Sequence, residues 1–237
     1  MQPILEAHRG YSALYPENTL LAFRKAIAVG ATSIELDVHV SSDAELIVMH
    51  DATLNRTSTG QGPIAEHTLS ELAKLDAGNW KNSAFAGEKI PTLEEALRLT
   101  LESNVTFNVE VKQFAGGLRD ARRLTGLLKR YAPKGARHVV SSFDLEALLQ
   151  VRQADPEIPL ALLGSQGGSL LALAVEHHFP WIHCCYTGVH QDLVFAAHRE
   201  GIKVMTWTMD QPRLYPHYTR LGVDKICTNR IAEMQSA

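Results

Sequence analysis

The sequence predicts a (β/α)8 barrel, also called a TIM barrel, with one small inserted subdomain after the second strand. Three observations favour this fold. The chain has 237 residues, close to the roughly 250 that are typical of such barrels. Short β-rich runs alternate with helical patterns along the chain, and polar residues gather where several of these runs end. The predicted barrel strands are 4–7, 33–38, 105–111, 138–142, 159–163, 181–185, 203–207 and 224–228.

Apolar residues recur with helical spacing in the segments between these strands. Clear examples are 19–30, 92–103, 145–155 and 193–201. Thr92 with Glu95, and Thr68 with Glu71, fit the capping boxes that begin helices. An open doubly wound sheet is the alternative arrangement of such units. Neither GxGxxG nor GxxxxGKS/T follows any strand, which disfavours the nucleotide-binding versions of that sheet.

One apolar run does not fit the alternation. Residues 45–51, ELIVMHD, follow the second strand after only SSDA, whereas a parallel crossover needs a dozen or more residues. The stretch therefore predicts an antiparallel hairpin that extends the second strand beyond the barrel mouth and returns His50 to it. Residues 51–91 form the longest excursion between barrel strands. Since long structured loops are often functional, we expect this excursion to be the subdomain over one side of the mouth.

The composition is that of an ordinary globular protein, with 45% hydrophobic residues, 21% charged residues and a net charge of −3. This charge predicts no general attraction to nucleic acid or to anionic membranes. No apolar run approaches the ~20 residues of a membrane helix, and the N-terminus lacks a signal-peptide pattern. We therefore expect one cytoplasmic domain over residues 1–237, without stable membrane association. The sequence does not indicate its oligomeric state.

The three cysteines are Cys184, Cys185 and Cys227. An odd number with two adjacent members does not make a disulfide framework. We expect buried free thiols, since free cysteine is among the most buried residue types.

Carboxylates gather at the ends of the second and third predicted strands, where barrel enzymes carry their chemistry. Glu35 and Asp37 lie two residues apart, and residues i and i+2 of a strand point to the same face. Glu110 and Lys112 are spaced in the same way. If both faces point inward, three carboxylates meet and need a cation, because they repel each other and lose hydration. The set suits one hard divalent ion, Mg²⁺ or Ca²⁺ with Mn²⁺ as a further candidate, better than zinc. Salt bridges at the rim, or a simple Glu110–Lys112 pair, are the structural alternatives.

Two histidines can approach this site, His8 at the end of the first strand and His50 on the hairpin. A histidine pair can supply a base and an acid near neutral pH. Arg9 and Lys112 are cations that suit phosphate oxygens. With a metal ion, these groups indicate phosphoryl chemistry on an anionic ester. A hydrogen-bonded structural role is the alternative for each histidine alone. The functional interpretation is favoured because several such residues fall at the same end of adjacent strands.

Three further residues belong to the predicted rim. Glu17 and Asn18 follow the first strand before a helix begins, although Asn18 has an alternative role as the N-cap of that helix. Trp207 ends the seventh predicted barrel strand and is either a mouth residue or a core aromatic. We leave five other histidines as structural or surface residues: His177, His178, His190, His198 and His217.

Through these motifs the sequence resembles the glycerophosphodiester phosphodiesterase family. The resemblance covers nearly the whole chain. It runs through 8–10 (HRG), 16–23 (PENTLLAF), 30–38 (GATSIELDV), 48–64 (VMHDATLNRTSTGQGPI), 89–97 (KIPTLEEAL), 107–112 (FNVEVK), 204–208 (VMTWT) and 221–229 (LGVDKICTN). The family's fold is a (β/α)8 barrel with an inserted small subdomain, in agreement with the strand pattern.

The resemblance implies hydrolysis of glycerophosphodiesters to glycerol 3-phosphate and an alcohol. By position, the metal ligands would be Glu35, Asp37 and Glu110. The acid–base histidines would be His8 and His50. The substrate-binding residues would be Arg9, Glu17, Lys112 and Trp207, with the two cations on the phosphate.

Two segments depart from the family's pattern. The last barrel strand often ends in TD before a proline in the family, whereas this chain has CTNRI with Asn229. The segment 207–212, WTMDQP, replaces the usual valine and asparagine after the tryptophan. Neither departure falls at the position of a predicted metal ligand or histidine.

Two other functions fit the same residues. A relative that cleaves a lipid phosphodiester, such as a lysophospholipase D or a sphingomyelinase D-like enzyme, would need apolar surface at the mouth. A non-catalytic, metal-dependent sensor of phosphate esters would bind without releasing product, but a pure binder has no need of a paired acid and base.

Overall fold

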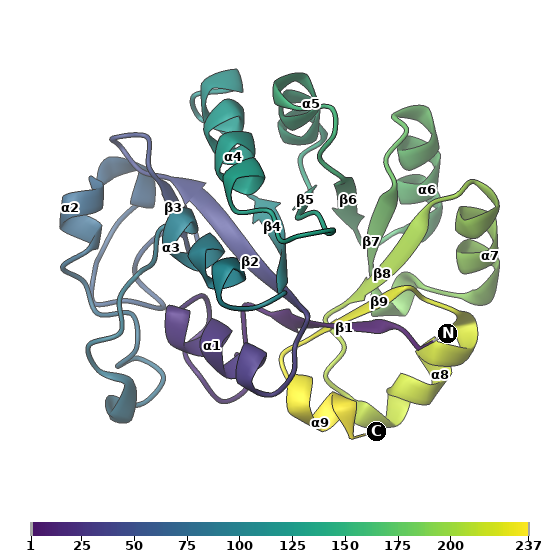
Figure 1. Cartoon of the computed structure of the whole chain (residues 1–237), viewed down its shortest axis with the longest axis horizontal. Helices are drawn as coiled ribbons and strands as arrows, with labels where there is room; N and C mark the ends of the chain where they lie inside the picture. The colour runs from purple at the N-terminus through teal and green to yellow at the C-terminus, as the bar shows by residue number, and fades with distance from the viewer. Residues whose placement is uncertain (1, 237) are drawn as a thin grey trace.

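A computed structural model describes residues 2–236. Within them, parallel strands close into a barrel because β1 pairs with β2 on one side and with β9 on the other, which confirms the (β/α)8 prediction (Figure 1). The barrel strands are β1 (Ile4–His8), β2 (Ser33–Val40), β4 (Thr106–Val111), β5 (Val139–Ser142), β6 (Leu160–Gly164), β7 (Trp181–Cys185), β8 (Lys203–Trp207) and β9 (Lys225–Thr228).

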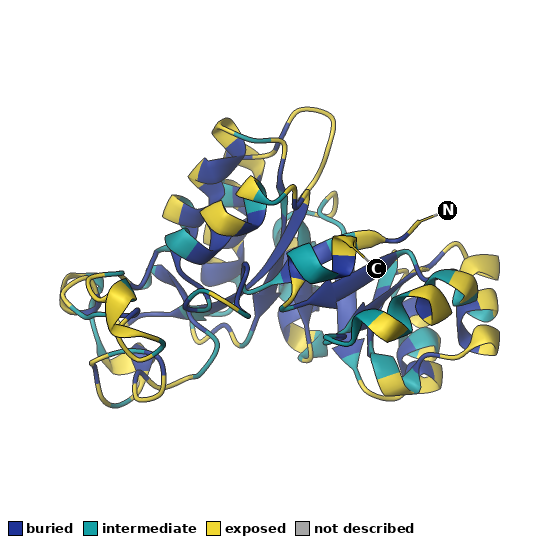
Figure 2. Ribbon diagram, turned by 90° about the horizontal axis from the view of Figure 1, so that it is seen from below, coloured by how far each residue is buried: buried dark blue, intermediate teal, exposed yellow. Residues whose placement is uncertain are grey.

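Helices follow the strands around the outside of the barrel (Figure 1). They are α1 (Leu20–Ala28), α3 (Leu93–Leu97), α4 (Leu118–Arg130), α5 (Leu145–Ala154), α6 (Gly167–Glu176), α7 (Gln191–Arg199), α8 (Tyr215–Leu221) and α9 (Ile231–Gln235). Their inner faces pack on the strands while their outer faces are exposed (Figure 2). The capping box of Thr92 and Glu95 at the start of α3 is confirmed.

The predicted hairpin is confirmed. Strand β3 (Leu46–Val48) runs antiparallel to the outer end of β2, with Val38 opposite Val48. The chain then enters residues 51–91, which contain α2 (Leu69–Leu72) with its capping box and lie beside β3 (Figure 1). This segment packs against β3 and the residues that follow it around a second, smaller core, made of Ile47, Met49, Leu54, Ile64, Leu72, Ala77 and Ile90.

The turn between β1 and α1 has a conformation that its sequence requires. Gly10 has φ +82°, and a Cβ there would lie 2.7 Å from the backbone carbonyl carbon of Ala22, so only glycine fits. Thr19 caps α1 by accepting a hydrogen bond from the backbone N–H of Ala22. The N-cap alternative for Asn18 is therefore wrong. The Asn18 amide instead donates from Nδ2 to Asp37 Oδ2 at 2.8 Å.

The barrel interior below the mouth is polar. Glu6 on β1 is fully buried and accepts hydrogen bonds from Lys225 Nζ at 2.6 Å and Ser33 Oγ at 2.7 Å. Burial alone would raise the pKa of Glu6, but the charge of Lys225 and the hydrogen bonds from Lys225 and Ser33 contribute to holding that pKa below its usual range. His183 on β7 is also fully buried, and burial lowers its pKa to about 3. Among residues 2–236, neither ring nitrogen of His183 has a hydrogen-bond partner.

Two sequence expectations concern the rest of the chain. Among residues 2–236, Cys184 and Cys227 are buried free thiols, while Cys185 is free and only half-buried. Within the same residues, no helix is long and apolar enough to cross a membrane.

Candidate active site

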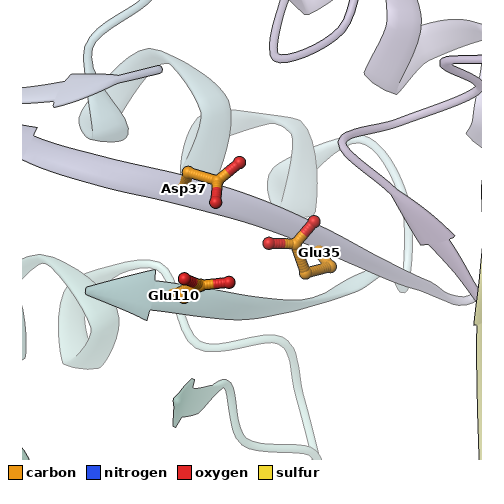
Figure 3. Close-up of side chains that lie close together, drawn as sticks. All are labelled: Glu35, Asp37 and Glu110. Atoms are coloured by element: carbon orange, nitrogen blue, oxygen red, sulfur yellow. The ribbon is translucent and has the colours of Figure 1, made fainter. Parts of the chain in front are cut away.

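Three carboxylates converge at the mouth of the barrel. Glu35 and Asp37 project from β2, and Glu110 projects from the adjacent strand β4 (Figure 3). All three are buried, and one oxygen of each lies within 4.8 Å of the others. The i, i+2 spacing of the sequence produces this arrangement, because both strands turn the same face inward.

Two cations hold Asp37 in place. Lys112 Nζ lies 2.7 Å from Asp37 Oδ1 and also contacts Glu110. Arg9 has φ +56° and brings its Nε to 3.2 Å from Asp37 Oδ2. Burial would raise the pKa of Asp37, but these two cations outweigh burial and hold that pKa well below its usual range. Lys112 therefore bridges two carboxylates instead of forming the simple pair with Glu110.

The other two carboxylates are in a different electrostatic state. Burial, and then repulsion from Asp37 and Glu110, raises the pKa of Glu35 well above its usual value. Burial, and then the charge of Asp37, also raises the pKa of Glu110. Within residues 2–236, Glu35 Oε1 is buried without a hydrogen-bond partner. Hard carboxylate oxygens, one of them unpartnered, fit a divalent ion such as Mg²⁺, Ca²⁺ or Mn²⁺, which would relieve the repulsion.

His8 has a defined tautomer. Asn229 donates its Nδ2 to Asp210 Oδ2 at 2.6 Å, so its Oδ1 faces His8 Nδ1 at 2.7 Å. Since that oxygen can only accept, Nδ1 carries the proton and Nε2 is left as an acceptor, 3.9 Å from Glu35 Oε2. Burial, and then the charge of Arg9, lowers the pKa of His8 to about 4.

The two departures from the family's pattern meet in this cluster. Asp210 lies in the segment 207–212, and its carboxylate binds both the backbone N–H and the side chain of Asn229. Because Asp210 and Asn229 contact each other, the two departing segments form one acid–amide pair beside His8.

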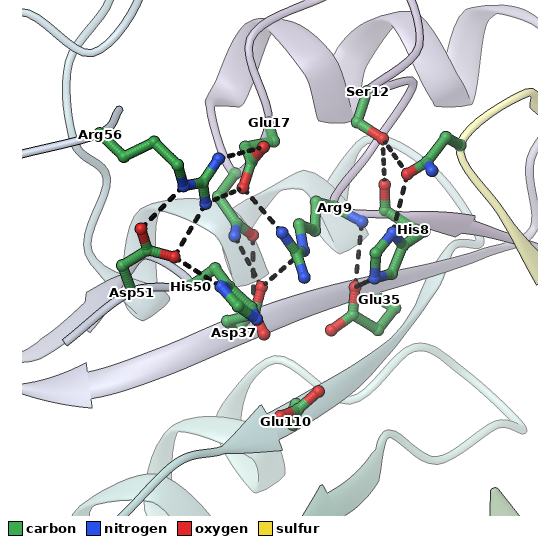
Figure 4. Close-up of polar contacts among 12 residues, drawn as sticks. His8, Arg9, Ser12, Glu17, Glu35, Asp37, His50, Asp51, Arg56 and Glu110 are labelled. Carbon is green, nitrogen blue, oxygen red and sulfur yellow. Dashed lines mark hydrogen bonds and ion pairs between the residues drawn. The ribbon is translucent and has the colours of Figure 1, made fainter. Parts of the chain in front are cut away.

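His50 is held by a chain of charges from the inserted segment (Figure 4). Its Nδ1 lies 2.7 Å from Asp51 Oδ1. Arg56 donates to Asp51 and also to both oxygens of Glu17. Glu17 in turn accepts from Arg9 at 2.8 Å. The chain of contacts thus runs from His50 to Arg9, which also contacts Asp37.

One cavity of about 130 Å³ joins most of these groups. Its lining includes both histidines, two of the carboxylates and both predicted phosphate-binding cations. An aromatic pair also lines it, in which Phe143 and Trp207 meet edge to face with ring centroids 5.6 Å apart. The lining residues predicted from sequence are His8, Arg9, Glu35, His50, Glu110, Lys112 and Trp207.

Two predicted site residues lie outside that lining. Asp37 is completely buried behind Arg9 and Lys112. Glu17 lies beside the mouth, with its oxygens occupied by Arg9 and Arg56, so its contacts are those of a residue that orients cations. Sequence reasoning missed Asp51 and Arg56, although the polar run that follows His50 was the available signal.

The comparisons with known proteins agree on one family. The model of the glycerophosphoryl diester phosphodiesterase family matches residues 8–233. A protein of Caldanaerobacter subterraneus subsp. tengcongensis named glycerophosphodiester phosphodiesterase is 35% identical, over 97% of this chain and 95% of its own length. A Bacillus subtilis protein of the same name is 31% identical, over 94% of this chain and 82% of its own length.

Solved structures extend the comparison to the fold. An Oleispira antarctica phosphodiesterase, solved in complex with the product sn-glycerol-3-phosphate, superimposes with a TM-score of 0.93 at 30% identity, covering 99% of this chain and 96% of its own. The glycerophosphodiester phosphodiesterase of Thermotoga maritima superimposes with a TM-score of 0.79 at 26% identity, covering 100% of this chain and 98% of its own.

Proposed function

The chain belongs to the glycerophosphoryl diester phosphodiesterase family, which is a family of enzymes, and we propose a reaction from that premise. In this reaction the protein hydrolyses glycerophosphodiesters to sn-glycerol 3-phosphate and an alcohol with the help of a divalent metal ion. One observation supports this most directly. Three carboxylates, of which Glu35 and Glu110 line the cavity, lie next to a cavity that also contains two histidines and two cations. The product complex of the Oleispira antarctica relative supports the choice of substrate.

Glu35, Asp37 and Glu110 would hold the metal ion, which supplies charge neutralisation at the phosphodiester and lowers the pKa of an oxygen nucleophile. The residues of the chain have separate tasks around it. Arg9 and Lys112 would bind the non-bridging phosphate oxygens. Because Asp37 already orients both cations, their geometry is set before the substrate arrives.

The two histidines would move the protons. His8 is uncharged near neutral pH and offers Nε2 as an acceptor, so it is suited to take the proton of the nucleophile. His50 is held through Nδ1 by Asp51 and would protonate the leaving alcohol from Nε2. The nucleophile is either the glycerol 2-hydroxyl, through a cyclic phosphate, or a water molecule. Trp207 and Phe143 would bound the space for the alcohol's head group.

The test is release of sn-glycerol 3-phosphate from glycerophosphocholine by chelator-treated enzyme, with and without added Mg²⁺, Ca²⁺ or Mn²⁺. We expect release only after metal is restored. A lysophospholipid with the same head group serves as the comparison for the lipid-cleaving alternative. Binding without release in every metal would contradict the proposal and favour the sensor. A cytoplasmic location and the absence of a nucleic-acid partner stay predictions from the sequence.

A further inference from the structure

Two buried polar side chains on the cavity lining have no function in the mechanism above. Asn108 lies on β4 two residues before Glu110, so the two share the inward face. Ser141 on β5 pairs in register with Glu110. Both side chains are at most 1% exposed, and both line the same cavity as Glu35. They form what we call the cavity floor, defined as Asn108 and Ser141.

The cavity floor presents oxygen atoms that nothing satisfies. Within residues 2–236, neither Asn108 Oδ1 nor Ser141 Oγ has a hydrogen-bond partner. A buried polar atom without a partner costs free energy, and native structures rarely tolerate it unless a ligand or water completes the bond. Two such atoms in the lining of one cavity therefore indicate a binding subsite.

Glu6, in the barrel interior, fixes the orientation of the Asn108 amide. Its Nδ2 donates to Glu6 Oε1 at 3.0 Å, and the other oxygen of Glu6 accepts from Lys225. An ionised carboxylate can only accept hydrogen bonds, so the amide must turn its NH₂ toward Glu6 and its Oδ1 away from it. The buried Glu6–Lys225 pair thus makes Asn108 an acceptor toward the cavity, and the occupant there must bring an O–H or N–H donor.

We propose that the cavity floor binds the hydroxyl groups of the substrate's glycerol arm, with Asn108 Oδ1 and Ser141 Oγ accepting or sharing their protons. This inference rests on the proposed function and adds the direction in which the substrate lies. A phosphate at Arg9 and Lys112 has two arms. The floor offers polar acceptors to one of them, whereas Phe143 offers an aromatic surface to the other.

The test compares two ligands that differ only in hydroxyl groups. Glycerol 3-phosphate and n-propyl phosphate have the same chain length and phosphate, and calorimetry gives the dissociation constant of each without turnover. We expect wild-type protein to bind glycerol 3-phosphate at least about tenfold more tightly, the range of one or two hydrogen bonds. Hydrolysis of glycerophosphocholine, assayed on the same preparation, tests the proposed function separately.

Ser141→Ala is the first variant, because the Ser141 hydroxyl has no partner within residues 2–236 and its removal leaves the protein's hydrogen bonds intact. Asn108→Leu is the second and removes the fixed acceptor. In both variants the dissociation constant for glycerol 3-phosphate should rise toward that for n-propyl phosphate. The dissociation constant for n-propyl phosphate should stay unchanged. Ser33→Ala is the matched control, because Ser33 is a buried serine that bonds Glu6 but is not part of the cavity lining.

Three results would overturn the inference. One is a wild-type protein that does not distinguish the two ligands. Another is a preference that Ser141→Ala and Asn108→Leu both leave intact, which would mean that the floor holds only water. The third is an equal loss of preference in Ser33→Ala, which would assign the effect to the barrel interior as a whole. If glycerol 3-phosphate binds with the expected preference but glycerophosphocholine is not cleaved, the proposed function fails while the subsite stands.

Discussion

Arg56 donates two hydrogen bonds to Asp51, from Nε to Oδ2 at 2.7 Å and from Nη2 to Oδ1 at 2.9 Å. The same Asp51 oxygen, Oδ1, lies 2.7 Å from His50 Nδ1. Because Arg56 fixes the Asp51 carboxylate, it also fixes the His50 ring that Asp51 bonds. The His50 Nδ1–H then points to Asp51, and Nε2 is left for the substrate. Arg56 would therefore be a positioning residue, which acts on the proposed reaction through His50.

Replacing Arg56 with glutamine should lower kcat more than it raises KM. The reason is that Asp51 and His50 lose their fixed orientation, whereas Arg9 keeps its contacts with Glu17 and Asp37. Removing the hydrogen-bond partner that orients a metal-binding side chain typically costs about 10–100-fold in activity. We expect a loss of similar size when the partner that orients Asp51 and His50 is removed. Steady-state kinetics on glycerophosphocholine measures the effect, and Arg56→Lys should recover only part of it because lysine cannot bind a carboxylate with two parallel hydrogen bonds.

Lys81 supplies the matched control for this prediction. It also joins the inserted segment to the first βα loop, since Lys81 Nζ donates to the backbone oxygen of Ser12 at 2.8 Å. Unlike Arg56, it makes no hydrogen bond or ion pair with Asp51 among residues 2–236. An equal loss of kcat in Lys81→Gln would show that Arg56 only tethers the segment.

His8→Ala and His50→Ala should each lower kcat by ~10²–10⁴, the usual range for general acid–base catalysis. Both side chains line the cavity and neither belongs to a hydrophobic core, so the circular dichroism spectrum should change little. His198→Ala is the control, because His198 lies on α7 and pairs with Asp224, apart from the cavity lining. Near-normal turnover in either mouth variant would remove that histidine from the mechanism.

The fold was readable from sequence because its elements are local. Each barrel strand is a β-rich run, and the impossibility of a parallel crossover in four residues identified the hairpin at residues 41–44. The i, i+2 rule was enough to bring Glu35 and Asp37 to one face. The burial of these side chains followed from the same strand pattern.

The network around the site was not readable, because it joins residues far apart in the chain. Asn229 contacts His8 across 221 positions, and Glu17 contacts Arg56 across 39. No local pattern encodes such pairs. The backbone at Asn18 adopts a positive φ of 58°, which sends its side chain to Asp37 and not to the helix that follows. The polar pair of Glu6 and Lys225 was hidden for a similar reason, since each lies in a run that reads as an ordinary strand.

Divalent metal should stabilise the folded protein measurably. A ligand at a hundred times its dissociation constant adds about 2.7 kcal/mol to the free energy of unfolding, or roughly 5–10 °C in Tm for a chain of this size. Thermal unfolding with EDTA and with saturating Mn²⁺ tests this. Glu35→Gln and Glu110→Gln should lose the shift, whereas Asp37→Asn is a poor probe because it also breaks the ion pairs of Arg9 and Lys112. An undiminished shift in both glutamine variants would place the ion elsewhere.

His183 should make the protein less stable as the pH falls. Its pKa in the folded state is about 3, lowered by burial, partly restored by Glu6 and lowered further by Lys225, while an unfolded histidine has a pKa near 6.5. Between these values the unfolded chain binds a proton that the folded chain does not, so stability rises with pH through this window and is complete above it. The contribution lost between pH 7 and pH 5 is about 2 kcal/mol, from integrating this linkage. Urea unfolding of metal-free protein at pH 7 and pH 5 should show this extra decline in wild type but not in His183→Leu. An equal decline in both proteins would mean that other groups carry the acid sensitivity.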